Sequence, residues 1–226
     1  MNRVVVITLI HDRSTRLPGK PFLPLGDKPL CRWSIETTAE AARVGGIDYR
    51  IAAWAGDECS MAMAADAGVE VLPRTERSAY GETVVDMYDQ PLVEALASWD
   101  VVLLVAYIFP FLTVPDHLEW IERARTADRA YGAARRRQGA IWDEAGRTLC
   151  GHAQPSTRHG SVFYEPRGAY YIFPTAVLGK PSMYEGVTPV DLPDKPRFRL
   201  DIKTSTDLAL AQAWVQSFKR STDDGR

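Results

Sequence analysis

The sequence predicts a single α/β domain built on a mostly parallel sheet, and two features carry this prediction. The first is a regular alternation of apolar runs with helical segments over about the first 130 residues, which is typical of consecutive β-α-β units. The second is the continuous apolar run Val101–Val105, which is typical of a strand buried on both faces. Because both faces must then be covered, we expect helices on either side of the sheet.

The expected elements of this first part follow in order along the chain. Apolar runs bounded by turn residues predict four strands: Val4–Leu9, Tyr49–Ala53, Val69–Leu72 and Val101–Val105. Between and after them the sequence predicts four helices: Leu30–Arg43, Glu58–Ala67, Glu82–Ala97 and one that ends near Ala127. Pro115 marks the start of the last of these, since proline fits the first turn of a helix.

The pattern changes in the second half of the chain. Residues Gln138–Pro166 show little periodicity, and Asp143–Arg147 resembles a hairpin turn, so we expect a small inserted β-ribbon there. Two further strands are predicted at Gly168–Phe173 and Phe198–Ile202. Thr204 is predicted to cap a final helix, with Asp207 three residues later in the position that a capping box requires.

Composition limits the classes of function. With 226 residues, 46% hydrophobic and 25% charged, the chain suits one domain, 1–226, that carries 138–166 as an inserted segment. The net charge of −2 argues against nucleic acid as a partner. Three widely spaced cysteines indicate neither a disulfide framework nor a zinc site. No apolar run approaches the ~20 residues of a membrane span, so we expect a cytoplasmic protein without a membrane partner.

Two cations follow the first predicted strand, in Ser14-Thr15-Arg16-Leu17-Pro18-Gly19-Lys20. Between Arg16 and Lys20, proline pre-sets φ and glycine permits a positive φ, which fixes the bend of the loop. Ligands of open α/β sheets bind at the carboxyl ends of the strands. The loop therefore predicts a site for an anionic, phosphorylated ligand, with a solvated surface turn as the alternative. Neither the P-loop pattern nor the G-x-G-x-x-G pattern is present.

This loop is the first of three motifs that occur in a fixed order. It continues into Pro24–Leu30, the second motif is Arg167–Phe173, and the third is Leu200–Thr204 with Asp207 and Leu208. In these motifs and their spacing the chain resembles the cytidylyltransferases that make CMP-activated sugar acids, namely the CMP-sialate synthetases, the KDO cytidylyltransferases and their spore-coat polysaccharide relatives. The resemblance implies a Rossmann-like, three-layer α/β/α nucleotidyltransferase fold with an inserted β-ribbon.

The resemblance also implies a reaction. CTP would react with a sugar acid or a similar small anionic acceptor to give a CMP-conjugate and pyrophosphate, with Mg²⁺ as cofactor. Arg16 and Lys20 would neutralise the charge that develops on the phosphate oxygens, and Asp201 would hold the metal. The relatives further imply that 138–166 contributes to a homodimer. The expected substrate-binding residues are Ser14, Arg74, Thr83, Arg158, Tyr171 and Lys203.

The sequence departs from the family pattern at several ligand-facing positions. His11-Asp12-Arg13 replaces an arginine and small residues of the phosphate-binding loop. Asp12 is either a relocated metal ligand, or it points to solvent or into a local turn. Ala106–Phe109 lacks the polar residues of the relatives, so we expect an apolar, aromatic wall. Of an S-T-D-D segment only Asp57 remains.

The last departure is Lys203, which stands where sialate-type relatives have a second carboxylate. On a strand, residues 201 and 203 share a face, so Asp201 and Lys203 together contribute no net charge to a cation site. Either Lys203 provides part of the charge that a metal offers to phosphate, or the site has lost its activity. The sequence thus leaves three hypotheses open: an active cytidylyltransferase, a catalytically degenerate homologue that binds a ligand or a regulatory partner, and a nucleotidyltransferase specific for another base.

Overall fold

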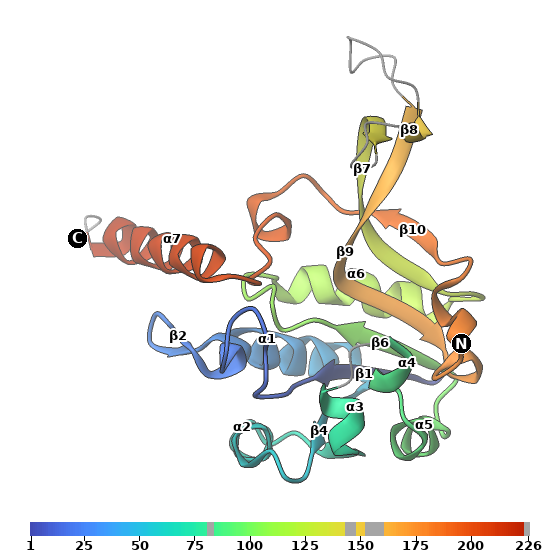
Figure 1. The fold of residues 1–226 in the computed structure, drawn as a ribbon. Coiled ribbons are helices and arrows are strands. Elements are labelled where there is room, and N and C mark those ends of the chain that lie inside the picture. The colour runs from blue at the N-terminus through green and yellow to red at the C-terminus, as the bar shows by residue number, and fades with distance from the viewer. Residues whose placement is uncertain (81–83, 143–147, 152–160, 224–226) are drawn as a thin grey trace.

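The computed structural model describes residues 1–80, 84–142, 148–151 and 161–223, and within them one large sheet organises the chain (Figure 1). Its strand order is β10-β7-β9-β6-β1-β4-β5, and β8 pairs with β7. Strands β6, β1, β4 and β5 run parallel, β9 is antiparallel to both β6 and β7, and β10 runs parallel to β7. The strands are β1 Val4–Leu9, β4 Asp48–Trp54, β5 Val71–Arg74, β6 Val101–Val105, β7 Tyr131–Trp142, β8 Thr148–Gly151, β9 Ser161–Pro174 and β10 Thr188–Asp191, beside a small hairpin of β2 Pro24–Leu25 and β3 Lys28–Pro29.

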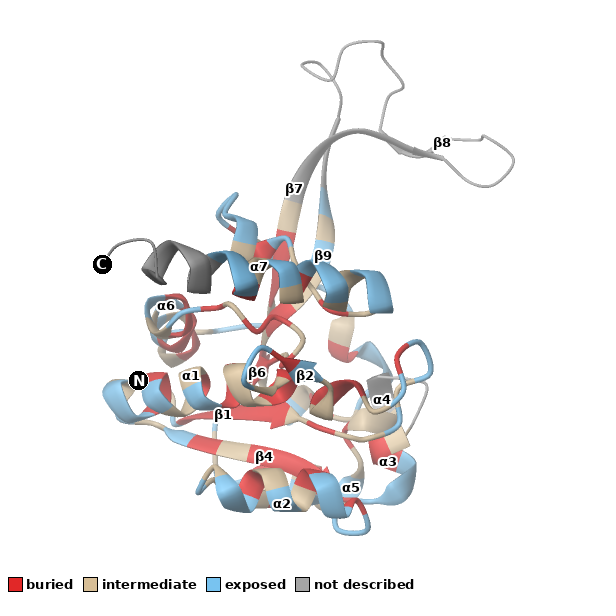
Figure 2. Ribbon diagram, turned by 90° about the vertical axis from the view of Figure 1, so that its left-hand side faces the viewer, coloured by how far each residue is buried: buried red, intermediate tan, exposed pale blue. Residues whose placement is uncertain are grey.

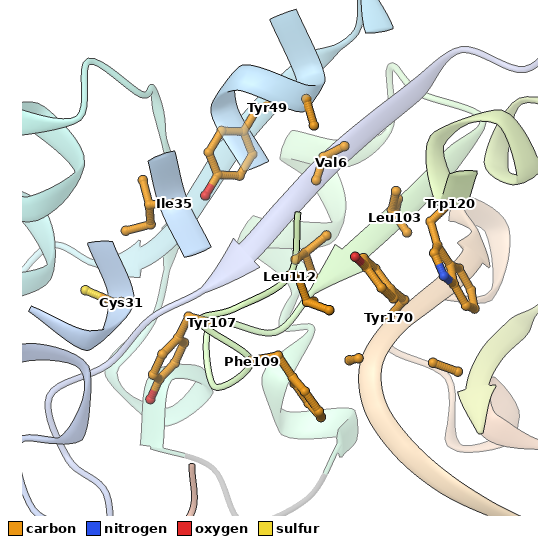
Figure 3. Packing of buried hydrophobic residues seen from close by; sticks show 14 of the residues in the cluster. Val6, Cys31, Ile35, Tyr49, Leu103, Tyr107, Phe109, Leu112, Trp120 and Tyr170 are labelled. Atoms are coloured by element: carbon orange, nitrogen blue, oxygen red, sulfur yellow. The ribbon is translucent and has the colours of Figure 1, made fainter. Parts of the chain in front are cut away.

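Helices cover both faces of this sheet. The alternating side chains of β1 show this directly, because Val4 and Val6 belong to one buried cluster and Val5 and Ile7 to another. The first cluster packs against α1 and α6, as Figure 3 shows for Ile35 and Trp120, and the second packs against α5. In Figure 2 the buried strands lie between half-exposed helices. The helices are α1 Leu30–Gly45, α2 Glu58–Asp66, α3 Glu76–Tyr80, α4 Val84–Met87, α5 Gln90–Leu96, α6 Val114–Arg125 and α7 Ser205–Asp223.

The predicted three-layer α/β/α architecture is therefore confirmed, and several elements agree closely with the sequence. Strands β1 and β6 have the predicted bounds, Val4–Leu9 and Val101–Val105. The capping box before α7 is also present, since the carboxylate of Asp207 accepts hydrogen bonds from the backbone N–H and the hydroxyl of Thr204. None of the described helices combines the length and the apolar character that crossing a membrane requires.

The single helix predicted over Glu82–Ala97 is wrong. Its described part divides into α4 and α5, and Asp89 lies between them as the N-cap of α5, accepting a hydrogen bond from the backbone N–H of Leu92 at 3.2 Å. Pro91 explains the division. Proline lacks the N–H that a continuous helix needs and fits only the first turn of a new one.

The strand predicted at Phe198–Ile202 is also wrong. Residues Pro196–Phe198 form a 3-10 turn, and the chain then continues without regular structure to α7. The backbone N–H of Ile202 donates to the carbonyl of Ile108 at 2.9 Å, which fixes this segment against the loop that follows β6.

The inserted ribbon is present in the described residues. Strand β7 pairs antiparallel with both β8 and β9, and the predicted strand Gly168–Phe173 is the end of the longer β9. In Figures 1 and 2, β7 and β9 continue beyond the body of the sheet. The hairpin turn predicted at Asp143–Arg147 lies outside the described residues. Dimerisation through the ribbon stays a prediction.

A half-buried ion pair holds the segment before α7 in place. Asp116, in the first turn of α6, accepts from Nε and Nη2 of Arg197, both at 2.6 Å, and from the backbone N–H of Thr113 at 2.8 Å. Burial alone would raise the pKa of this carboxyl, but the hydrogen bonds from Arg197 and Thr113 outweigh it and lower the pKa. The same carboxylate therefore caps α6 and anchors the residues that lead to Asp201.

Candidate functional site

The loop after β1 delivers Lys20 to the carboxyl end of the sheet. Gly19 has a left-handed conformation with φ 65°, which glycine adopts without strain. Its N–H donates to the carbonyl of Asp12 at 3.2 Å, and the N–H of Lys20 donates to the carbonyl of Leu17 at 3.1 Å. Leu17 is buried and anchors the loop in the core. Lys20 then begins a 3-10 turn, Lys20–Phe22.

Lys20 is a buried amine that has no carboxylate partner in the described parts of the chain. The residue is only 9% exposed, and among the described residues its Nζ forms no ion pair within 4.0 Å. Its pKa is lowered first by burial and then by the positive charges of Arg16 and Lys203, while Asp201 opposes this effect. Nζ lies 5.7 Å from the centre of the Tyr107 ring. A buried ammonium with this surplus of positive charge is stabilised by an anion.

Asp201 and Lys203 lie beside Lys20 and form an ion pair. Lys203 Nζ is 2.5 Å from Asp201 Oδ2, although the approach is not that of a hydrogen bond, and Oδ2 accepts none from the described residues. The two residues were expected on one face of a strand. The segment that contains them is not a strand, so the predicted geometry is wrong, and their direct ion pair is a finding of the structure. Arg167, from β9, lies on the other side, with Nη1 4.0 Å from Asp201 Oδ1.

This arrangement fits a divalent cation poorly. Mg²⁺ prefers oxygen ligands from carboxylates, carbonyls and water. Asp201 is already paired with Lys203 and faces Arg167, and the described residues contain no group of three His, Cys, Asp or Glu side chains suited to a metal ion. Mg²⁺ bound at Asp201 thus stays a prediction that the donor set does not support.

Asp12 fixes the loop after β1 against α3. Its carboxylate accepts a hydrogen bond from the hydroxyl of Tyr80 at 2.9 Å, and its backbone N–H donates to Asp57 Oδ2 at 2.9 Å. Both contacts are long-range, so Asp12 neither points to solvent nor closes a local turn. Asp57 is buried and also caps α2 through Ser60. The one remaining residue of the S-T-D-D segment is therefore structural.

Aromatic residues surround the same loop. The ring of Tyr80 packs edge-on against both His11 and Trp54, and the guanidinium of Arg13 lies 4.3 Å from its centre. The pKa of His11 is lowered first by burial and then by the positive charges of Arg74 and Lys20. His11 thus lies within electrostatic range of both of these predicted site residues.

Arg74 is buried, with part of its guanidinium unsatisfied. Nε donates to Ser78 Oγ at 3.0 Å, whereas Nη1 has no hydrogen-bond partner among the described residues. Burial lowers the pKa of Arg74 to about 10. The buried hydroxyl of Tyr88, which lies within electrostatic range of Arg74, is likewise unpartnered within the described ranges. Unsatisfied buried polar atoms in one place are typical of a site that a ligand completes.

Tyr171 lines a separate cavity of about 340 Å³ between β7, β9 and β10. Its ring stacks on Phe173 and meets Tyr184 edge-on. The walls of the cavity are mostly apolar, and its lining residues are Gly132, Ala133, Ala134, Tyr164, Pro166, Tyr171, Tyr184, Val187 and Pro189. Tyr171 therefore lines this separate cavity, and its predicted role in substrate binding stays a prediction.

The aromatic wall expected at Ala106–Phe109 takes a different form. Phe109 is completely buried and Tyr107 is 6% exposed, and both pack in the core (Figure 3). Only Ala106 and Ile108 are half-buried. The partly exposed side chains of this segment are therefore small or aliphatic, and the two aromatic rings belong to the buried core.

The predicted site residues therefore divide into groups. Three of them, Arg16, Asp201 and Lys203, interact electrostatically with a fourth, Lys20. Arg74 lies near them beyond His11, and Ser14 is half-buried in the loop. Thr83 and Arg158 lie outside the described residues. The role of Arg167 was not predicted, although this residue opens the second motif.

Comparisons with known proteins agree with the observed fold. No protein-family model and no curated protein matches the chain. Three solved structures that do match it each cover 94–95% of this chain. One is CMP:2-keto-3-deoxy-manno-octonic acid synthetase in complex with CTP, with a TM-score of 0.65, 15% identity and 99% of its own length covered.

The other two matching structures have similar scores. One is 4-diphosphocytidyl-2C-methyl-D-erythritol synthase from Anaerococcus prevotii, with a TM-score of 0.62, 15% identity and 96% of its length covered. The other is a cytidylyltransferase from Leptospira borgpetersenii, with a TM-score of 0.63, 16% identity and 87% of its length covered. The chain has the nucleotidyltransferase fold. In this fold the cationic cluster around Lys20 occupies the carboxyl end of β1, which is the edge where open α/β sheets bind ligands.

Proposed function

We propose that this nucleotidyltransferase-fold protein is a cytidylyltransferase that transfers CMP from CTP to a sugar acid or another small anionic acceptor. The observation that carries the proposal is Lys20, a buried amine that begins the turn after β1 and lacks a carboxylate partner among the described residues. Arg16 adds a second positive charge close by. Three cytidylyltransferases share the fold, and one of them is a complex with CTP.

The chemistry makes direct use of these charges. An acceptor oxygen attacks the α-phosphorus of CTP and forms a new P–O bond, while the bond from the α-phosphorus to the bridging oxygen breaks. Pyrophosphate leaves with the electron pair, and the proton of the acceptor hydroxyl passes to solvent. Negative charge accumulates on the departing phosphate oxygens, where Lys20 and Arg16 stabilise it. The partly unsatisfied guanidinium of Arg74 is suited to an anionic group of the acceptor.

Two further parts of the proposal rest on the sequence and the resemblance. We propose a cytoplasmic location and a homodimer formed through the ribbon of β7, β8 and β9. Tyr164, on β9, is 42% exposed and offers apolar surface to a second copy.

A second candidate is a homologue that binds nucleotide without turnover. The observation that favours it is the pairing of Asp201 with Lys203, together with the aliphatic residues Ala106 and Ile108 in place of polar ligand contacts. Both candidates predict CTP binding, and only the first predicts pyrophosphate release.

A thermal-shift screen with the four nucleoside triphosphates tests the binding step. We expect CTP to stabilise the protein more than ATP, GTP or UTP does. At a concentration 100 times its Kd, CTP should raise the free energy of unfolding by about 2.7 kcal/mol. Cytidine without phosphates serves as the control and should give a much smaller shift. A larger shift with ATP, GTP or UTP would indicate another base specificity, and equal shifts with all four would indicate that the base is not recognised. No shift with any of them would contradict the proposal.

A further inference from the structure

The charges around Asp201 do not match those of a cation site. Lys203 and Arg167 lie within 4.0 Å of this one carboxylate, Lys20 lies within its electrostatic range, and Arg16 adds a fourth positive charge within range of Lys20. Glu165 lies further out, 3.8 Å from Arg167. The carboxylate of Asp207 also lies within electrostatic range of Lys203. Even when all three carboxylates are counted, the positive charges exceed the negative ones by one. Such a cluster repels a divalent cation and attracts a polyanion.

Lys203 is placed to contact that polyanion. Its side chain is 40% exposed, whereas that of Asp201 is 14% exposed, so the ammonium group lies on the solvent side of the pair. A lysine ammonium carries three donors. One side of it faces Asp201, which leaves donors to reach phosphate oxygens. Lys203 is also fixed at its backbone, because its N–H donates to Asp207 Oδ2 at 3.0 Å.

The neighbouring cations complete the same surface. The positive charge of Lys203, like that of Arg16, lowers the pKa of Lys20. The two lysines are therefore close enough to contact one ligand. The side chain of Arg167 is 14% exposed, and its Nε has no hydrogen-bond partner in the part of the chain that the structure describes. Asp201 therefore has a positioning role: it holds Lys203 and faces Arg167, and it offers no spare charge for a metal ion.

We propose that Lys203, held by Asp201, is a phosphate-binding residue, and that with Lys20 it supplies the charge compensation that a divalent cation would otherwise provide. The protein consequently binds a nucleoside triphosphate without Mg²⁺. This inference rests on the proposed function, because it concerns the same site.

Calorimetric titration of the full chain with CTP, in EDTA and in excess MgCl₂, tests the proposal. We expect the wild-type protein to bind CTP in EDTA at least as tightly as in MgCl₂. Lys203→Met should weaken binding in EDTA about 10- to 100-fold, the effect of losing one charge-assisted contact. Lys203→Asp creates a pair of carboxylates and should make binding dependent on Mg²⁺. Lys180→Met removes an exposed lysine that follows the C-terminal end of β9, and it should leave CTP binding unchanged in both buffers.

The outcomes distinguish a failure of this inference from a failure of the proposed function on which it rests. Binding of CTP to the wild-type protein only in MgCl₂ would overturn the inference and leave the proposed function intact. Unchanged binding by Lys203→Met in EDTA would also overturn it. Absence of CTP binding in both buffers would overturn the proposed function and this inference with it. A far-ultraviolet circular dichroism spectrum equal to that of the wild type shows that a variant is folded.

Discussion

Lys20→Met is expected to abolish most of the stabilisation that CTP gives to the protein. Lys20 is the most buried cation of the cluster and lacks a carboxylate partner among the described residues. A bound triphosphate would be its counter-charge. If affinity falls about 100-fold, CTP at 100 times the wild-type Kd stabilises the variant by only about 0.4 kcal/mol, against about 2.7 kcal/mol for the wild type.

The unliganded variant should nevertheless fold as well as the wild type. Burial lowers the pKa of Lys20, so the folded state disfavours the charged amine. That penalty is fully present below the folded-state pKa and disappears as the pH rises toward the ordinary lysine value of 10.5. Methionine fills similar space without the charge. Lys180→Met is the matched control, and a variant of Lys20 that keeps the full CTP shift would contradict this assignment.

Asp116→Ala is expected to destabilise the folded protein strongly. The change leaves the guanidinium of Arg197 without its partner and removes the cap of α6. Losing the cap and this half-buried pair together should cost about 2 kcal/mol, equivalent to a fall in Tm of roughly 4–8 °C for a chain of this size. Urea unfolding at pH 7 measures the loss. Glu119→Ala, at an exposed position of the same helix, is the control and should stay within about 0.5 kcal/mol of the wild type.

The pH dependence of this difference gives an independent check. The folded-state pKa of Asp116 lies below the ordinary aspartate value of 3.8. Its contribution to stability is therefore complete above that value and is lost as the pH falls through the folded-state pKa. The difference in the free energy of unfolding between the wild type and Asp116→Ala should be constant from about pH 5 to pH 8 and should become smaller below about pH 4. If this difference in the free energy of unfolding stayed the same down to pH 2, the ionised pair would not be its cause.

The same substitution should weaken CTP binding, although Asp116 is not part of the cationic cluster. Arg197 begins the segment that continues to Asp201 and Lys203, and its ion pair with Asp116 anchors that segment to α6. Once released, the two site residues lose their fixed position relative to Lys20. We expect weaker CTP binding by Asp116→Ala and wild-type binding by Glu119→Ala.

Much of the fold could be predicted because the signals are local. The apolar run Val101–Val105 is continuous, and β6 has the same bounds as the predicted strand. Thr204 and Asp207 form a capping box whose residues are only three apart. In contrast, the prediction of one helix over Glu82–Ala97 is wrong because Pro91 divides that segment. The strand predicted at Phe198–Ile202 lacked a neighbouring strand to pair with among the described residues, which sequence alone does not reveal.

The candidate site was less predictable because its contacts join distant parts of the chain. Asp12 and Tyr80 are 68 residues apart, and neither residue type indicates the other as its partner. Arg167 and Asp201 come from different motifs and meet only because β9 and the segment before α7 converge. The opposed charges of Asp201 and Lys203 were visible in the sequence. Their direct pairing, and its consequence for a metal ion, required the three-dimensional structure.

Simultaneous detection of pyrophosphate and of the CMP-conjugate tests the central claim most directly. The protein is incubated with CTP and a panel of sugar acids and phosphonates, and the products are analysed by mass spectrometry. We expect one acceptor to gain a cytidylyl group in a 1:1 ratio with released pyrophosphate, and Lys20→Met to abolish both signals. CTP binding without pyrophosphate release for any acceptor in the panel would contradict the enzymatic account and favour the non-catalytic homologue.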